Sequence, residues 1–131
     1  MSTATFIAME RQRALWGIHA QIVRAIVAAG DWEGDEPFDI AEALGLAAPR
    51  HDAARPILLV GPAENASPIR ALGPVALRQV EVSSVLPVPQ LARHPDQRQT
   101  VSGLSFVEGG MPLLVLDPIA LLALAGEHRR P

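Results

Sequence analysis

The sequence predicts an all-β fold with two short helices. Three observations support this prediction: many short apolar runs are separated by polar turns, two aspartates each precede a short Leu- and Ala-rich stretch, and the order of elements repeats once. A chain of 131 residues with 49% hydrophobic content can bury a core of its own. We therefore expect one domain over residues 1–131, built of two barrel-type subdomains, approximately 1–56 and 57–131, whose strands can exchange.

The chain opens on a predicted hairpin. Two apolar runs, Thr5–Met9 and Ala14–Ile18, are separated by the polar residues Glu10–Arg13. The next apolar run, Ile22–Val27, alternates poorly. It fits either a strand or one side of a helix over Gly17–Ala29, and periodicity does not decide between them.

A short helix and a buried strand follow. Asp39 is a good N-cap, helix-forming residues come after it, and Gly45 ends the stretch, which predicts one or two helical turns. A polar, Pro-containing connector over Ala47–Pro56 leads to Ile57–Val60. This last run is continuously apolar, which is typical of a strand buried on both faces.

The second half of the chain predicts four strands, a loop and a helix. Pro87 and Pro89 indicate a sheet edge or a strand end, and Asp117 is placed to cap the last helix. The elements are expected as strands at Val75–Glu81, Val82–Val88, Val101–Val107 and Pro112–Leu116, a loop at Leu91–Thr100 and a helix at Pro118–Ala125.

An internal echo relates the two halves. Ala14–Ile18 followed five residues later by Val23 matches Ala76–Val80 followed five residues later by Val85. Each half then approaches one of the two capping aspartates. The order of features is the same twice, which favours two similar small β subdomains packed together, each too small to bury a core well alone.

Composition excludes several function classes. The net charge is -3 and all 11 basic residues are arginines without a basic run, so nucleic acid is not an expected partner. The absence of cysteine and of an export signal predicts a cytoplasmic location. The longest apolar stretch, Met111–Ala125, contains Asp117 and is shorter than the roughly 20 residues of a spanning helix. It is expected to be core.

No pattern of catalytic or cofactor-binding residues stands out, and we expect no enzyme activity, no cofactor and no metal. The histidines lack metal-ligand spacing, and no serine has a nucleophile-elbow motif. A cluster of acids does not follow the Ca²⁺-loop pattern. It predicts a solvated face or a surface that steers a basic partner; its members are Asp31, Glu33, Asp35, Glu36, Asp39 and Glu42.

Packing and turn patterns resemble those of the CheW-like adaptor family of bacterial chemosensory arrays, over nearly the whole chain. The strongest is Val75–Pro89, with its Leu-Pro-x-Pro ending; Thr100–Leu104, Pro112–Leu122 and Gly34–Gly45 are also similar. The resemblance implies two small five-stranded Src-homology-3-like barrels in pseudo-symmetric arrangement. It also implies a non-enzymatic adaptor.

The chain departs from that family in one place. Members usually carry a Pro-rich stretch and an Asn-Leu-Arg-Gly-like segment between the second and third strands, and here only Ala28–Glu33 remain. No residue of this chain matches that segment. Coupling to the usual partners is therefore open even if the fold is shared.

The resemblance implies three kinds of partner: the regulatory domain of a CheA-type histidine kinase, the cytoplasmic tip of a chemoreceptor, or a homologous adaptor. Candidate partner-binding residues in a groove between the subdomains are Val23, Ile26, Val85 and Val88, and plain core is an equal alternative for each. Trp32, in the shortened connector, fits an interface and internal packing equally well. The alternative functions are a small-ligand-binding or enzymatic β-barrel, or a diverged family member in another signalling complex.

Overall fold

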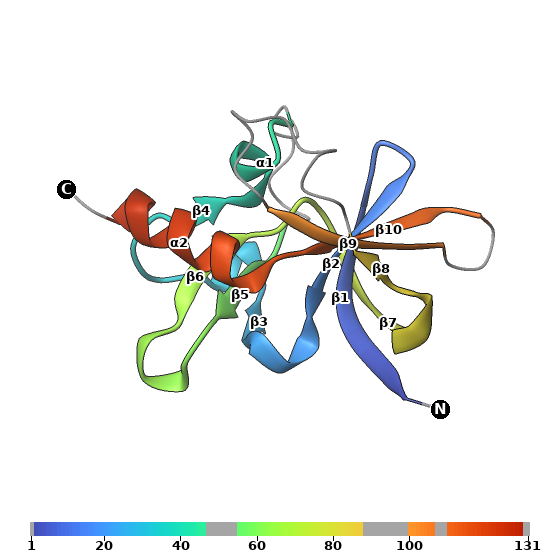
Figure 1. The fold of residues 1–131 in the computed structure, drawn as a ribbon. Helices are drawn as coiled ribbons and strands as arrows, with labels where there is room; N and C mark the ends of the chain where they lie inside the picture. The colour runs from blue at the N-terminus through green and yellow to red at the C-terminus, as the bar shows by residue number, and fades with distance from the viewer. Residues whose placement is uncertain (1, 47–54, 88–99, 107–109, 130–131) are drawn as a thin grey trace.

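The computed structural model describes residues 2–46, 55–87, 100–106 and 110–129. Within them strands dominate, as predicted (Figure 1). The strands are β1 (Thr3–Arg11), β2 (Ala14–His19), β3 (Val23–Val27), β4 (Phe38–Asp39), β5 (Ile57–Val60), β6 (Ser67–Arg70), β7 (Val75–Glu81), β8 (Leu86–Pro87), β9 (Val101–Phe106) and β10 (Pro112–Leu116). The helices are α1 (Ile40–Ala43) and α2 (Pro118–Arg129), with 3₁₀ turns η1 (Ala20–Ile22), η2 (Ala29–Asp31), η4 (Ala63–Asn65) and η5 (Val82–Ser84).

The opening hairpin is confirmed. β1 and β2 pair antiparallel through Arg11 and Ala14, and the turn between them has only two residues. Gln12 and Arg13 have φ values of 55° and 62°. Positive φ at both central positions is the turn geometry that matches the right-handed twist of a hairpin.

The ambiguous segment after β2 is a strand. The turn η1 redirects the chain, and Val23–Val27 then pairs antiparallel with β5, with Val27 opposite Ile57. β3 lies at the edge of its sheet. Its poor alternation is explained by this position, because three of its five residues are exposed whichever way they point.

The short helix α1 begins as predicted. The Asp39 carboxylate accepts a hydrogen bond from the Ala41 N–H at 2.9 Å and forms an ion pair with Arg55. Arg55 is only 2% exposed, and its Nε donates to the Ala71 carbonyl at 2.8 Å. The helix therefore starts on a cap that is itself held by a buried arginine, and Gly45, with φ of 69°, follows its end.

The strands β4 and β6 were not predicted from the sequence. In β6, Pro68 lies opposite Leu59 of β5, and the parallel neighbour β4 pairs only with Ile69 and Arg70. One side of Pro68 therefore has no ladder to interrupt. This explains how a segment that contains a proline pairs within a sheet.

The prediction of a strand over Val82–Val88 is wrong. Val82–Ser84 forms the turn η5, in which the Val85 N–H donates to the Val82 carbonyl, and only Leu86–Pro87 pair as a strand. The turn is required because the chain must pass from β7, at one edge of a sheet, to β8, at the other. Val88 lies outside the described residues.

The closing elements are confirmed, with one difference in length. β9 and β10 pair antiparallel, and the Asp117 carboxylate accepts hydrogen bonds from the N–H groups of Ile119 and Ala120. The helix continues to Arg129 rather than ending at Ala125. Of the predicted loop Leu91–Thr100, only Thr100 is described, and it is buried.

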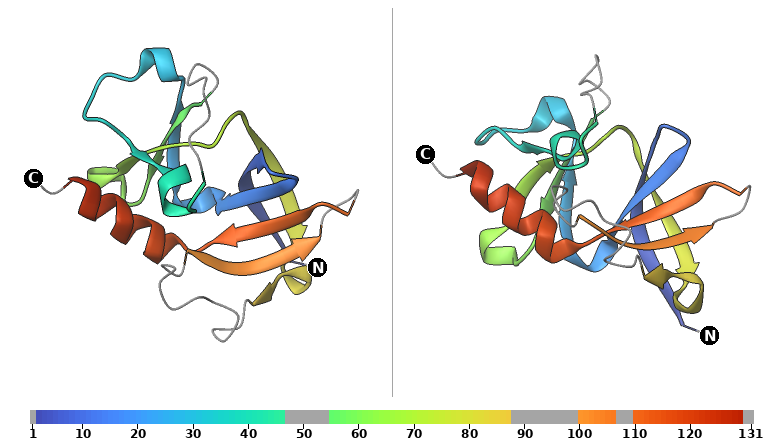
Figure 2. Two further views of the ribbon diagram at one scale, coloured as in Figure 1. Left: turned by 90° about the horizontal axis from the view of Figure 1, so that it is seen from above. Right: turned by 45° about the horizontal axis from the view of Figure 1, so that its top comes forward.

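Two sheets combine strands from both halves of the chain. One has the order β7-β1-β2-β10-β9-β8 and the other β3-β5-β6-β4. Since β7 and β8 are joined by the three-residue turn η5, the two edges of the six-stranded sheet come together and the sheet curls. The helix α2 follows β10 but packs on β6 and β4 of the other sheet, as the two views of Figure 2 show.

The strand β1 contributes to two core clusters. Phe6 and Ala8 point into a smaller cluster inside the six-stranded sheet, with Leu113 and Val115 among their neighbours. Ile7 and Met9 point the other way. They join a larger cluster that also holds residues of α1, β5, β6 and α2: Ile18, Phe38, Ile40, Ala41, Leu58, Val60, Ile69, Ala71, Leu72, Leu116, Leu121, Leu124 and Ala125.

The internal echo corresponds to a repeated local structure. β2 continues through η1 into β3, and β7 continues through η5 into β8. The first residue after each turn, Val23 and Val85, donates its N–H to the first carbonyl of that turn. The two matching sequence stretches therefore form the same strand, turn and strand.

Candidate protein-binding surface

The predicted partner residues of β3 differ in exposure. Val23 is half-buried and packs against the larger core cluster. Ile26 is 48% exposed, as expected for an edge strand. Of these two, Ile26 is the residue that a partner can reach directly.

The predicted residues near β8 lie in a different part of the molecule. Val85 is half-buried and packs against the smaller core cluster, and Val88 lies outside the described residues. β3 and β8 are edges of different sheets, and Figure 2 shows them well apart. The described residues of this set therefore do not line one common groove, and a partner contact at each stays a prediction.

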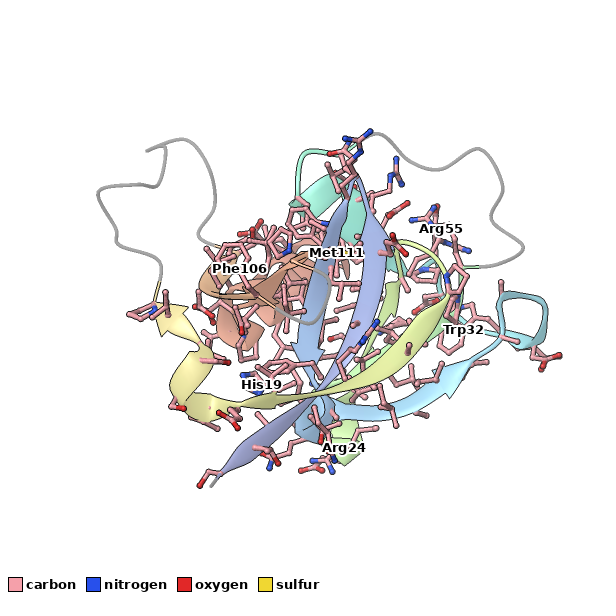
Figure 3. All side chains as sticks on the ribbon, turned by 90° about the vertical axis from the view of Figure 1, so that its right-hand side faces the viewer. His19, Arg24, Trp32, Arg55, Phe106 and Met111 are labelled. Carbon is pink, nitrogen blue, oxygen red and sulfur yellow. The ribbon has the colours of Figure 1, made fainter. Side chains whose placement is uncertain are left out.

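Trp32 packs on its own loop. Its indole N–H donates to the Asp35 carbonyl at 2.9 Å, and its ring covers Gly34, where an added Cβ would lie 2.7 Å from the ring atom Cζ2. The side chain is half-buried, and its neighbours in the sequence, Asp31 and Glu33, are exposed. Figure 3 shows where Trp32 lies. Trp32 thus combines local packing with partial exposure to solvent.

A contiguous apolar surface occurs elsewhere, on the outer face of β8, β9 and β10. Leu114 lies opposite Leu104, and Leu104 lies opposite Leu86. Cross-strand neighbours share a face, so these three leucines form one row. Phe106, two residues after Leu104, extends the same face. We call Leu86, Leu104, Phe106 and Leu114 the outer apolar patch.

The patch is the solvent-exposed part of a longer apolar row that crosses the six-stranded sheet. Leu86 and Phe106 are 58% and 65% exposed, and Leu104 and Leu114 are half-buried. The row continues from Leu114 to Trp16. From there it reaches Met9 and Val75, which lie against the larger core cluster. One half of an apolar row across the sheet is therefore core, and the other half is surface.

The patch rests on a firmly packed layer. The residues that alternate with it, Leu113, Val115 and Ser105, are buried beneath the sheet. Ser105 Oγ lies 2.9 Å from Ser84 Oγ, which ties η5 to β9. A surface held this way needs little reorganisation before it binds.

The sequence signal for this surface was present but ambiguous. Leu104 and Phe106 alternate with Gly103 and Ser105, as in a strand with one apolar face. Periodicity separates the two faces of a strand but does not say which face is covered. The candidates predicted in this region were Val85 and Val88, and Leu86, which lies between them in the sequence, belongs to the patch.

The described residues do not indicate a metal centre or a membrane span. No group of three or more His, Cys, Asp or Glu side chains among them could hold a metal ion. In the same part of the chain, no helix is both long and apolar enough to cross a membrane.

Comparison with solved structures identifies the fold. No protein-family model and no curated protein matches the sequence. Among solved structures, the scaffolding protein CheW of Thermoanaerobacter tengcongensis superimposes with a TM-score of 0.68, covering 88% of this chain and 90% of that chain at 11% sequence identity. The fold is that of CheW.

The predicted fold class is therefore confirmed: the chain is all-β with two helices, in two small barrel-like units. Within the described residues, the sheets have six and four strands where the resemblance implies five and five. β8 accounts for part of this difference. After the turn η5 the chain pairs with β9, at the edge opposite β7, and so adds a sixth strand to the same sheet. At 11% identity the similarity concerns the fold, and it leaves the partner surface to be located on this chain's own residues.

Proposed function

We propose that this protein is a non-enzymatic adaptor of a bacterial chemosensory system, and that the outer apolar patch is its main partner-binding surface. The observation that carries the proposal is a row of three leucines on the outer face of a CheW-like barrel, with Leu86 exposed and the other two half-buried, extended by the exposed Phe106. The CheW match is itself a scaffolding protein.

The physical basis is the free energy of covering this surface. Exposed apolar groups that adjoin one another on one face are typical of interaction sites, whereas single ones are ordinary surface. Phe106 supplies a rigid aromatic anchor, flanked by Leu104. Small-molecule sites are concave with convergent polar groups, so an apolar face on the outside of a sheet fits a protein better.

The partners proposed are those that the family resemblance implies: the regulatory domain of a CheA-type histidine kinase, a chemoreceptor tip, or a homologous adaptor. Ile26 and Trp32 lie on β3 and on the loop after it, away from the outer apolar patch. They are proposed as contacts of a second partner. Two separate surfaces are what an adaptor needs in order to hold two proteins at once.

The test compares a patch variant with a matched control. Phe106→Glu places a charge in the patch, and Ile119→Glu places the same charge at a 79% exposed isoleucine on α2, outside it. Binding of each variant to the purified kinase regulatory domain, receptor fragment and homologous adaptor of the source cell is measured by calorimetry.

We expect Phe106→Glu to weaken binding to one of the three partners by about 30-fold or more, the effect of losing a hot-spot residue. Ile119→Glu should bind as the parent does. Circular dichroism of both variants checks that the fold is retained. Equal affinity of the two variants for every partner that binds the parent would contradict the assignment of the patch, and binding to none of the three would contradict the proposed function.

A further inference from the structure

Two corners of the chain have the same local structure but are held by different contacts. At the first corner β2 continues through η1 into β3, and at the second β7 continues through η5 into β8 (Figure 1). We call Val82–Pro87 the second corner. It carries Leu86 of the outer apolar patch, so the contacts that hold it also position part of the proposed binding surface.

The first corner is fixed through backbone groups of β5 and the residue after it. β3 pairs with β5 at four positions. Gly61, directly after β5, donates its N–H to the Ile22 carbonyl at 2.8 Å, and the Gly61 carbonyl accepts a hydrogen bond from Arg24 Nε at 2.9 Å. These contacts hold both η1 and β3 against β5. The first corner should therefore open only together with the four-stranded sheet.

Strand pairing contributes less at the second corner. β8 pairs with β9 at two positions, Leu86 with Leu104 and Pro87 with Gly103. Opposite residues in an antiparallel ladder alternate between pairs that exchange both backbone hydrogen bonds and pairs that exchange neither. Proline has no N–H, so the exchanging pair is Leu86 with Leu104. Within the described residues, β8 and β9 thus share one hydrogen-bonded pair.

Two serine side chains supply a second connection. Ser84, in η5, donates its hydroxyl proton to the Glu81 carbonyl at 2.8 Å, and Ser84 Oγ lies 2.9 Å from Ser105 Oγ. A hydroxyl has one proton to donate. Because the proton of Ser84 is directed to Glu81, Ser105 is the donor to Ser84. We call Ser84 and Ser105 the hydroxyl pair; it links β9 through η5 to the end of β7.

The buried member of the hydroxyl pair makes this connection depend on the closed corner. Ser105 is 1% exposed and lies opposite Leu113, which belongs to the smaller core cluster. A buried hydroxyl without a hydrogen-bond partner raises the free energy of the folded state. Ser84 is the partner of Ser105 among the described residues. The bond between them therefore favours the closed position of the corner.

We propose that the second corner opens as a unit while the two sheets stay folded, and that the hydroxyl pair controls the population of the open form. Opening moves Leu86 away from Leu104 and so divides the outer apolar patch. Ser105 is then a positioning residue, because it acts on the patch through Ser84. The inference rests on the proposed function only for the use of the patch, since the opening is a property of this chain alone.

Hydrogen exchange under native conditions measures the opening. The amides of Leu86 and Leu104 report on the second corner. The amides of β1, which has a paired strand on each side, report on the six-stranded sheet. In the parent chain the two corner amides should exchange faster than those of β1. Their exchange should also respond less to urea, because a local opening exposes little surface.

Substitutions in η5 test the hydroxyl pair. Ser84→Ala leaves the buried Ser105 hydroxyl without its partner and should speed exchange at Leu86 and Leu104 by about tenfold or more. Ser84→Thr keeps a hydroxyl and should exchange as the parent does. The double variant Ser84→Ala/Ser105→Ala also removes the unpaired hydroxyl, so it should exchange more slowly than Ser84→Ala alone. Ser83→Ala, at an exposed serine of the same turn, is the matched control and should leave exchange unchanged.

A core variant separates local opening from global unfolding. Ile69 is 0% exposed and belongs to the larger core cluster. Ile69→Val removes one buried methyl group and lowers global stability. It should speed exchange of the β1 amides while leaving Leu86 and Leu104 unchanged, because the open corner keeps the core intact.

Each contrary result overturns the proposal. Equal exchange of the corner amides and the β1 amides in the parent would show that the corner opens only by global unfolding, as would acceleration of both groups by Ile69→Val. Unchanged exchange in Ser84→Ala, or a double variant that exchanges no more slowly than Ser84→Ala, would remove the role of the hydroxyl pair. The chain is measured alone, so these outcomes are separate from those of the partner-binding test.

Discussion

Among the charged side chains of the described residues, Arg55 is the one that is buried. It is 2% exposed, its Nε bonds to the Ala71 carbonyl, and its guanidinium pairs with the Asp39 carboxylate that caps α1. It thereby links β6 and its following residue to the start of a helix from the first half of the chain. The cap was predicted from the sequence but the arginine was not, because nothing local marks Arg55 as buried.

Replacing Arg55 with alanine should lower the free energy of unfolding by about 3–5 kcal/mol. The loss leaves a partly buried carboxylate and the Ala71 carbonyl without their partner. Urea unfolding measures it, with Arg78→Ala as the control, because Arg78 is exposed and should cost about 0.5 kcal/mol or less. Similar losses for the two variants would contradict the role assigned to Arg55.

The two tryptophans should differ in what they contribute to stability. Trp16 packs against the larger core cluster and donates its indole N–H to the Arg11 carbonyl. Trp32 packs on Gly34 within its own loop. We expect Trp16→Ala to cost about 3 kcal/mol and Trp32→Ala about 1 kcal/mol or less, measured by thermal unfolding. A larger loss at Trp32 would show that it is a core residue and remove it from the partner-binding candidates.

At the scale of elements, β9 can contact the corner after η5 because Gly103 has no side chain. An added Cβ at Gly103 would lie 2.9 Å from Val85 Cγ1 and 3.4 Å from the Leu86 carbonyl oxygen. Val85 belongs beside the smaller core cluster, and Leu86 begins the outer apolar patch. The glycine therefore allows the chain to close the curled sheet at this point.

Gly103→Ala should destabilise the protein by about 1–3 kcal/mol, since the corner must shift to admit the methyl group. Because the shift moves Leu86, partner affinity should fall as well. Gly30→Ala is the matched control, with no neighbour within 4 Å of its added Cβ. Chemical denaturation of both variants checks the prediction, which fails if Gly103→Ala is as stable as the control.

For the elements, local signals were sufficient where the reason for the structure is local. The opening hairpin, the capped starts of α1 and α2 and the buried strand β5 follow from apolar runs, turn residues and N-caps within a few positions. β6 and the η5 turn were missed for the opposite reason. Pro68 is tolerated because β4 is too short to reach it, and η5 is a turn because the sheet closes there.

At the scale of the whole molecule, the two sheets should unfold together. β1 alternates between the two core clusters through Phe6 and Ile7, and both sheets mix strands from the two halves of the chain. The larger core cluster holds residues of both sheets, so unfolding of either sheet would expose the apolar residues of the other. The predicted single domain should therefore show one cooperative transition.

Calorimetry together with circular dichroism and tryptophan fluorescence tests this expectation. The three transitions should coincide, and the calorimetric and van't Hoff enthalpies should agree. Leu121→Ala, in the larger cluster, should shift the whole transition to lower temperature, because α2 covers the four-stranded sheet. Two separable transitions would instead show two independent subdomains.

The candidate binding residues, like the helices and strands, fall into those predicted from the sequence and those recognised only in the structure. Val23 and Val85 were named from strand patterns, and the structure places both at equivalent corners, half-buried beside the core. Phe106 and Leu86 were not named as candidates. A pattern of alternation defines two faces of a strand, but exposure depends on what the rest of the chain covers.

The sequence by itself determined the all-β class, most strand positions, both helix caps and the echo that relates the two halves of the chain. These depend on side-chain periodicity and on hydrogen bonds between near neighbours. Only the tertiary structure decided which strands share a sheet, which half of an apolar row becomes core, and which edge stays open. Those outcomes depend on contacts between residues far apart in the chain, and no local pattern carries the free energy of those contacts.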